Sequence, residues 1–275
     1  MALIYDTDLV EVLTSADAED LSILTDHITD KGDGRLSLSS DTCKKLVDAR
    51  VAGEFSAEIR ALIGEELQRF GGNSLVNLMR GGTGVTYSEI ARDVADHVKA
   101  KFPTKAECAE VEMAILLRVL EQAYEQMTEE EKKKLFEEFG AFYKGEGAGP
   151  ASMASLIAAI KLSGFGFYKL AAVVANAVAK ALLGRGLGFG AAAAMMRGIS
   201  VFAGPVGWAI TAIWTAFDLA SPAYRVTVPC VIQIAYMRQK RLSQKCSTCS
   251  APLQGGAKFC AECGARVGVP ALPAP

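Results

Sequence analysis

The sequence predicts an all-α protein in which a multi-helix acidic body is followed by Gly/Ala-rich hydrophobic helices and a small C-terminal β-type zinc ribbon. Three observations predict this: recurring helix-start signals in the first half, a long uncharged stretch in the second, and two Cys-x-x-Cys pairs near the C-terminus. A chain of 275 residues can bury a substantial core. We expect an acidic helical domain at 1–148, a hydrophobic basic helical region at 149–243, the ribbon at 244–268 and a disordered tail at 269–275.

The first part of the chain predicts short helices. Ser, Thr or Asp starts are followed by acidic first turns and by apolar residues at helical spacing, over segments near 8–14, 17–29, 41–52 and 57–70. The pair Gly71-Gly72 is expected to end the last of these helices as a C-cap. The stretch Asp30 to Gly34 is expected to be a turn.

Three Thr/Glu pairs have the three-residue spacing of a capping box, in which the two side chains satisfy free amides at a helix start. The pairs are Thr86 with Glu89, Thr104 with Glu107, and Thr128 with Glu131. They predict helices near 87–102, 105–127 and 129–144.

The Gly-rich run that ends at Pro150 marks the expected boundary between the two halves. Further on, residues 198–217 are uncharged, which is the length of a membrane-spanning helix. Gly204, Pro205 and Gly207 interrupt this window. It therefore fits a buried hairpin of a soluble core, a peripheral or re-entrant membrane segment, or a true span.

Charge is divided unevenly along the chain. Residues 1–150 hold 29 acidic and 17 basic side chains, whereas residues 151–275 hold 2 acidic and 12 basic ones. Two halves of one globule could attract each other, or the basic, apolar half could contact an anionic inner-membrane surface. Ser221-Pro222 is expected to open a helix that reaches Leu242 and bends at Pro229. Its basic end would stay on the cytoplasmic side of a membrane.

The strongest motif is the double pair Cys246, Cys249, Cys260 and Cys263. Two such pairs separated by a short hairpin can place four thiolates tetrahedrally around one zinc ion. Gly264 would relieve backbone strain in the second turn. Because all four ligands are thiolates, the zinc is expected to be structural. Phe259 is the one aromatic residue there, which argues against nucleic acid as a partner and favours protein.

No catalytic constellation is readable, so the sequence predicts a protein that is not an enzyme. The other cysteines, Cys43, Cys108 and Cys230, lie among apolar neighbours, and neither His27 nor His97 has a sequence link to any of them. The first ten residues carry two aspartates and no basic region, so no signal peptide is visible. We expect the protein in the cytoplasm or on the cytoplasmic face of the inner membrane.

Two stretches resemble a bacterial family, the YaaW-like proteins, which are sometimes grouped with the ubiquinol-cytochrome c chaperones. These are ELQRFGGNS with RGGTGVTYSEIARDV (residues 66–74 and 80–94), and GPVGW with SPAYRVTVPCVIQIAY (residues 204–208 and 221–236). The resemblance covers most of residues 1–243 and implies an all-helical cytoplasmic protein with no established activity. The chaperone grouping implies assembly work on membrane complexes. The zinc ribbon is an addition to the simplest family pattern.

Two glycine-rich turns in the first of these stretches flank a short helix. They make Asn73, Asn77 and Arg80 candidates for a polar site, although the simpler interpretation is that the glycines cap helices while Asn and Arg bond exposed backbone carbonyls. Arg225 is the further candidate.

Two functional hypotheses follow. One is a non-enzymatic, membrane-associated helical protein with a protein-binding zinc ribbon. The other is a soluble chaperone or adaptor for assembly of a membrane complex. Neither the oligomeric state nor the partner can be read from the sequence.

Overall fold

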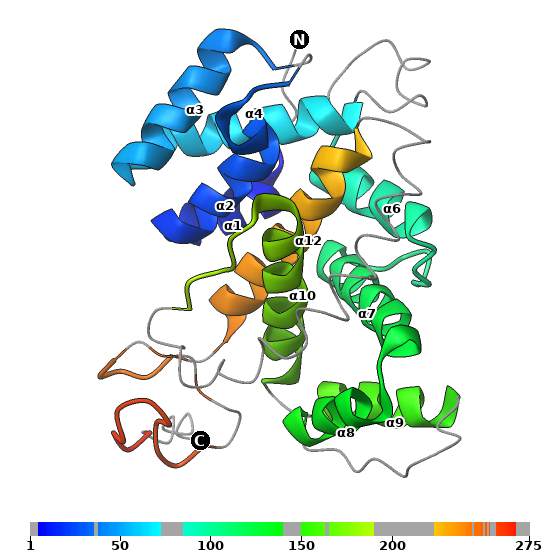
Figure 1. Ribbon diagram of the computed structural model, residues 1–275. Coiled ribbons are helices and arrows are strands. Elements are labelled where there is room, and N and C mark those ends of the chain that lie inside the picture. Colours follow the sequence, from blue (N-terminus) through cyan, green and yellow to red (C-terminus); the bar gives the residue numbers. More distant parts are fainter. Residues whose placement is uncertain are drawn as a thin grey trace, which may run out of the picture.

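The computed structural model describes residues 5–35, 38–72, 85–139, 150–162, 165–189, 223–243, 245–249, 251, 253 and 257–267. Helices dominate this part of the chain, which confirms the predicted all-α class (Figure 1). Their bounds are α1 Thr7–Ser15, α2 Ala18–Thr29, the 3-10 turn η1 Asp30–Gly32, α3 Ser40–Ala52, α4 Ala57–Gly72, α6 Tyr87–His97, α7 Cys108–Gln126, α8 Glu129–Glu138, α9 Pro150–Leu162, α10 Gly166–Leu183 and α12 Tyr224–Leu242.

Side-chain caps begin most of the N-terminal helices where the sequence predicts them. Asp6, Asp17 and Ser39 accept hydrogen bonds from the first turns of α1, α2 and α3. Two of the expected capping boxes, at Thr86 and Thr128, form with both reciprocal bonds. The expected turn at Asp30 to Gly34 is also present. These helix starts therefore follow from local chemistry.

The third expected capping box, Thr104 with Glu107, is wrong. The Ala106 amide donates to the Pro103 carbonyl at 2.9 Å, so Thr104 lies in a turn that precedes the helix. The Glu110 carboxylate instead accepts from the Glu107 amide at 2.9 Å, and α7 begins at Cys108. The helix start is displaced by three residues because Glu107 and Glu110, a second pair with the same three-residue spacing, form the capping box.

Two expected helix ends also differ. The helix expected to reach residue 102 ends at His97, because Lys99 adopts a left-handed φ of 60° and the Ala100 amide donates back to the Ala95 carbonyl at 2.8 Å. Gly71-Gly72 does not cap α4 from outside but forms its last turn. A Cβ atom at Gly71 would collide with the Ile90 side chain of α6, so this glycine permits close helix packing.

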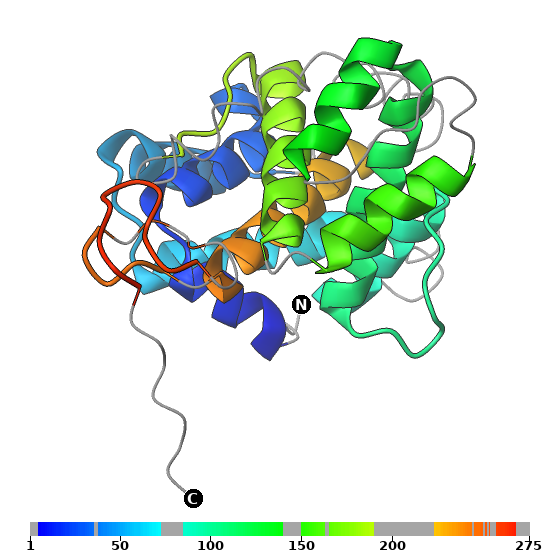
Figure 2. The same ribbon diagram turned by 90° about the horizontal axis from the view of Figure 1, so that it is seen from below.

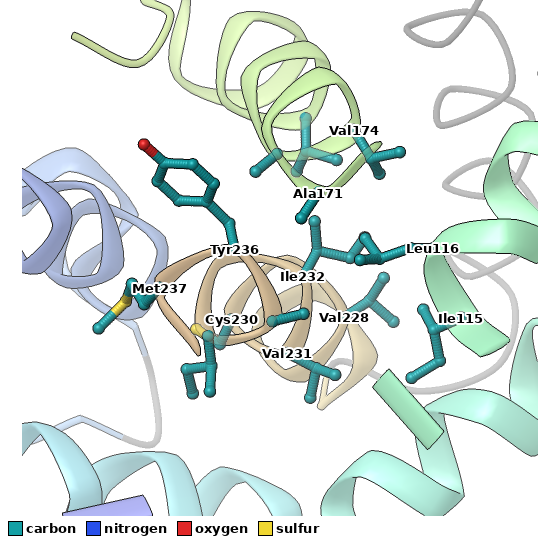
Figure 3. Packing of buried hydrophobic residues seen from close by; sticks show 14 of the residues in the cluster. Ile115, Leu116, Ala171, Val174, Val228, Cys230, Val231, Ile232, Tyr236 and Met237 are labelled. Atoms are coloured by element: carbon teal, nitrogen blue, oxygen red, sulfur yellow. The ribbon is translucent and has the colours of Figure 1, made fainter. Parts of the chain in front are cut away.

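Helix α12 is the centre of the fold. It packs against α1, α2, α4, α6, α7 and α10, so both halves of the chain surround it. Figure 3 shows its side chains pointing outward in all directions, with Ile232 toward Leu116 of α7 and Ala171 of α10 above it. The whole stretch from Val226 to Arg238 is buried. The described helix begins at Tyr224, continues through Pro229 and ends at the predicted Leu242, while the expected start at Ser221-Pro222 lies outside the described residues.

Helix α10 is the one helix among the described residues that is long and apolar enough to cross a membrane, and 67% of it is buried inside the protein. It packs against α7, α9 and α12. The buried core helix of a soluble protein can have the same length and composition. The uncharged window at 198–217 and the expected boundary at 145–150, except Pro150, lie outside the described residues. The domain division stays a prediction.

Candidate functional site

The four cysteines of the C-terminal segment come together as the sequence predicts. The Sγ atoms of Cys246 and Cys263 are 3.7 Å apart, those of Cys249 and Cys260 are 3.6 Å apart, and all four lie within 4.8 Å of one another. Four thiolates bound to zinc at about 2.3 Å would be separated by about 3.8 Å in a tetrahedron. The donor set therefore fits a metal ion with little rearrangement.

The backbone holds the two pairs in matching turns. The Cys246 amide donates to the Ala251 carbonyl at 2.8 Å, and the Cys260 amide donates to the Ala265 carbonyl at the same distance. Gly264 has a φ of 72°, which confirms the need for glycine in the second turn. Both turns thus point their thiols to one centre.

This segment has a small hydrophobic cluster of its own, separate from the main core. Cys246, Ala251, Leu253 and Cys260 are buried in it. Phe259 and Arg266 form an isolated antiparallel bridge, while a full β-ribbon is not present among the described residues. Figures 1 and 2 show the segment at the edge of the molecule, beyond the end of α12. With so small a cluster, we expect the order of this segment to depend on metal binding by the thiols.

Electrostatics favour a thiolate in the first pair. The backbone amides of Cys249 and Thr248 lower the pKa of Cys246 to about 6. The Thr248 amide lies 3.4 Å from the Cys246 sulfur. Metal ions bind the thiolate form, so these amides help to prepare the site.

The other cysteines and the histidines are not part of any such centre. Burial raises the pKa of Cys230 to about 12 and also raises that of Cys108. Burial lowers the pKa of His27 to about 3, and His97 stacks on Tyr224 with ring centroids 3.8 Å apart. Burial also lowers the pKa of His97. The Cys108 and Cys230 thiols therefore stay protonated, and both imidazoles stay neutral at neutral pH.

A buried ion-pair network joins α12 to three other helices. The Arg238 guanidinium donates to Glu112 of α7 at 2.7 and 3.1 Å, and to Asp8 of α1 at 2.7 and 2.8 Å. The Tyr87 hydroxyl of α6 donates to Glu112 at 2.7 Å. Burial raises the pKa of Glu112, while Arg238 and Tyr87 act in the opposite direction. The network fixes α12, from the second half of the chain, against three helices of the first half.

No pattern in the sequence predicts this network. The buried stripe of α7 runs through Glu112, Ile115, Leu116 and Val119, so a charged residue lies within an otherwise apolar face. One feature of the sequence could have indicated that Glu112 is buried: it lies four residues before Leu116 and therefore on the same face of the helix. Its partner Arg238 lies 126 positions away in the sequence, so no local pattern could pair them.

The basic end of α12 also pairs with the acidic half. Lys240 lies 2.6 Å from Asp17 and 2.8 Å from Asp20, and Arg241 lies 3.0 Å from Glu11. The uneven charge of the two halves is therefore used, at least here, for attraction within one molecule.

The predicted polar site can be placed only in part. Arg225 is exposed in the first turn of α12. Asn73, Asn77 and Arg80 lie outside the described residues, so their grouping stays a prediction.

A family model and several related proteins match most of this chain. A family model described as ubiquinol-cytochrome C chaperone matches residues 58–232. A UPF0174 protein of Helicobacter pylori strain J99 is 38% identical over 240 residues, covering 87% of this chain and 94% of the relative. The UPF0174 protein YaaW of Escherichia coli K12 is 30% identical over 237 residues, covering 85% and 94%. No solved structure matches the chain.

Proposed function

Since the chain belongs to the YaaW-like UPF0174 family, we propose that it is a chaperone-like, non-enzymatic helical protein that acts by binding other proteins. The observation that carries this proposal is the match of residues 58–232 to the chaperone family model. The region matched includes α12 from Tyr224 to Ile232, which is about the first half of the buried helix around which the body is built.

The C-terminal segment is proposed to hold one structural zinc ion through Cys246, Cys249, Cys260 and Cys263. The support is the four-sulfur geometry and the chemistry of the donors, since thiolates favour zinc over magnesium or calcium. A site with four thiolates is closed, so the metal would supply no catalytic position. Phe259, 61% exposed beside this centre, is available for a protein contact.

The experiment is site-specific photo-crosslinking of the full chain in its bacterial cells. A photoreactive residue replaces an exposed apolar side chain in turn: Val51, which is 77% exposed, Leu162, 87% exposed, or Phe259. We expect a discrete covalent adduct with another protein from at least one position, absent without irradiation. If none of the three positions gives such an adduct although the protein is expressed and folded, a protein-binding function is rejected.

Membrane association is the second candidate, and the apolar composition of residues 198–217 favours it. The basic end of α12 gives it less support, because Arg238, Lys240 and Arg241 pair with acidic residues of the same molecule. The two candidates place the protein at the inner membrane or in the cytoplasm. Cell fractionation with a carbonate wash separates them: a spanning protein stays in the pellet, a peripheral one is released, and a soluble one never sediments.

A further inference from the structure

We propose that the groove between α1 and α4 binds an amphipathic helix of a partner protein whose flanks carry Lys or Arg. This inference rests on the proposed protein-binding function and names the surface and the chemistry of the partner. The two helices run in opposite directions, because Arg60 of α4 contacts the last carbonyls of α1 and Gly64 approaches Leu9 nearer its start. Figure 2 shows α1 at the edge of the molecule next to α4.

The groove is large and apolar. Its volume is about 570 Å³, and its apolar lining comes from Leu9, Val10 and Leu13 of α1 and from Ala57, Ala61 and Gly64 of α4. The floor is closed, since Leu9 and Leu13 are 2% and 3% exposed. Val10 is 37% exposed, so apolar surface remains open to a ligand.

Small residues make the groove possible. A Cβ atom at Gly64 would already lie 3.3 Å from the Leu13 side chain, so a larger residue would fill the floor. Ala57 and Ala61 form the opposite wall and are exposed. Two antiparallel helices with a wall of small side chains leave the space that the ridge of a third helix occupies in ordinary helix packing.

The length of the groove suits a helix. Its lining runs from Ala57 to Gln68 along α4, which at 1.5 Å per residue is about 16 Å, or about three helical turns. Binding of a helix through residues at i, i+3, i+4 and i+7 is a common way of recognising peptides in such grooves. We therefore expect apolar anchors on one face of the partner helix.

The charge around the groove selects a basic partner. Glu65 lines the groove, and Glu58 is exposed on the first turn of α4; within the described part of the chain neither has an ion-pair partner. The one cation of the lining, Arg60, is engaged with the carbonyls of Phe55, Leu13 and Ala16. A partner with Lys or Arg beside its apolar face would place cations next to two carboxylates.

The test uses a fluorescent synthetic helix of about four turns with Leu and Ala on one face and Lys on the other. A second peptide has Glu in place of Lys, and a third has the Lys peptide's composition in scrambled order. Anisotropy titrations with the full, zinc-loaded protein should show binding of the Lys peptide and binding weaker by about tenfold or more, equivalent to about 1.4 kcal/mol, for the other two.

Variants locate the binding. Val10→Arg and Ala61→Arg place a bulky cation at exposed positions of the groove and should weaken binding of the Lys peptide by about tenfold or more. Val51→Arg introduces the same side chain at an exposed apolar position on α3 and should leave binding unchanged. Glu65→Lys should weaken it, while Glu130→Lys on α8 should not. Circular dichroism checks that each variant is folded.

Several results would overturn the inference. These are no binding of the Lys peptide, equal binding of all three peptides, or equal loss in Val51→Arg and Ala61→Arg. Protein adducts at Val51, Leu162 or Phe259 that survive Ala61→Arg would leave the protein-binding function in place and reject the groove as its site. In a competition titration, a fatty acid that displaces the fluorescent Lys peptide at a lower concentration than unlabelled Lys peptide does would assign the groove to a small apolar ligand instead.

Discussion

Replacing Arg238 with methionine should destabilise the protein severely, because it leaves a carboxylate in the core without its counter-charge. The side chain of Arg238 is 5% exposed and that of Glu112 is fully buried. Methionine keeps most of the length and apolar stem of arginine but none of its hydrogen-bond donors. After the substitution, Glu112 retains only the Tyr87 hydroxyl among the partners described above.

Removing one partner of a buried ion pair costs about 3–5 kcal/mol, and this range applies here. Whole domains are stable by about 5–15 kcal/mol, so the variant loses a large part of its stability. The matched control is Arg241→Met on the same helix. Its pair with Glu11 has side chains 33% and 55% exposed, and such surface pairs contribute about 1 kcal/mol or less.

The loss should depend on pH with a defined sign. Burial already raises the pKa of Glu112 above its ordinary value of 4.5, and removal of the Arg238 cation raises it further. The folded variant then binds a proton that the unfolded chain releases, so the contribution of this carboxyl to stability is greatest below pH 4.5 and is lost as the pH rises through the folded-state pKa. The difference between Arg238→Met and the parent protein should therefore be larger at neutral pH than in mild acid.

The assay is urea unfolding followed by circular dichroism, for the parent and both variants at mildly acidic and neutral pH. A double variant, Arg238→Met with Glu112→Leu, should recover much of the loss, since apolar replacement of a buried pair is often neutral or stabilising. The reasoning is refuted if Arg238→Met costs no more than Arg241→Met, or if the double variant is less stable than the single one.

Three further predictions concern the metal centre, a helix contact and a helix start. Cys260→Ser with Cys263→Ser should remove one equivalent of zinc, measured by atomic emission, and should disorder residues 246–268. The circular dichroism of the helical body should hardly change, because the C-terminal segment has a hydrophobic cluster separate from the main core. Unfolding of the helical body in this variant would contradict that separation. Gly71→Ala should lower the free energy of unfolding by about 1–3 kcal/mol in urea titrations because its Cβ collides with Ile90, and a neutral effect would show that α4 and α6 can move apart. Glu110→Ala should cost about 1 kcal/mol and Thr104→Ala less than about 0.5 kcal/mol in the same titrations; the reverse order would restore the cap expected from the sequence.

Helix starts were predictable from the sequence more accurately than helix ends. A start depends on one side chain three residues from the amide it binds, as at Thr86 and Thr128. The end of α6 depends on a left-handed Lys99, a residue type with no preference for that conformation. Thr104 and Glu107 have the same spacing as the two capping boxes that form. Thr104 nevertheless lies in a turn closed by the hydrogen bond between Pro103 and Ala106, and the three-residue spacing does not predict that turn.

The sequence by itself determined the all-helical class, most helix starts and the gathering of four cysteines near the C-terminus, because each depends on residues close together in the chain. The tertiary structure decided what packs around α12, which basic side chains are used within the molecule, and where an apolar groove stays open. Arg238 and Glu112 illustrate the reason: each is an ordinary charged residue on its own helix, and only packing places both in the same dry interior. Charge pairing over such distances depends on the whole arrangement of helices, which no local pattern encodes.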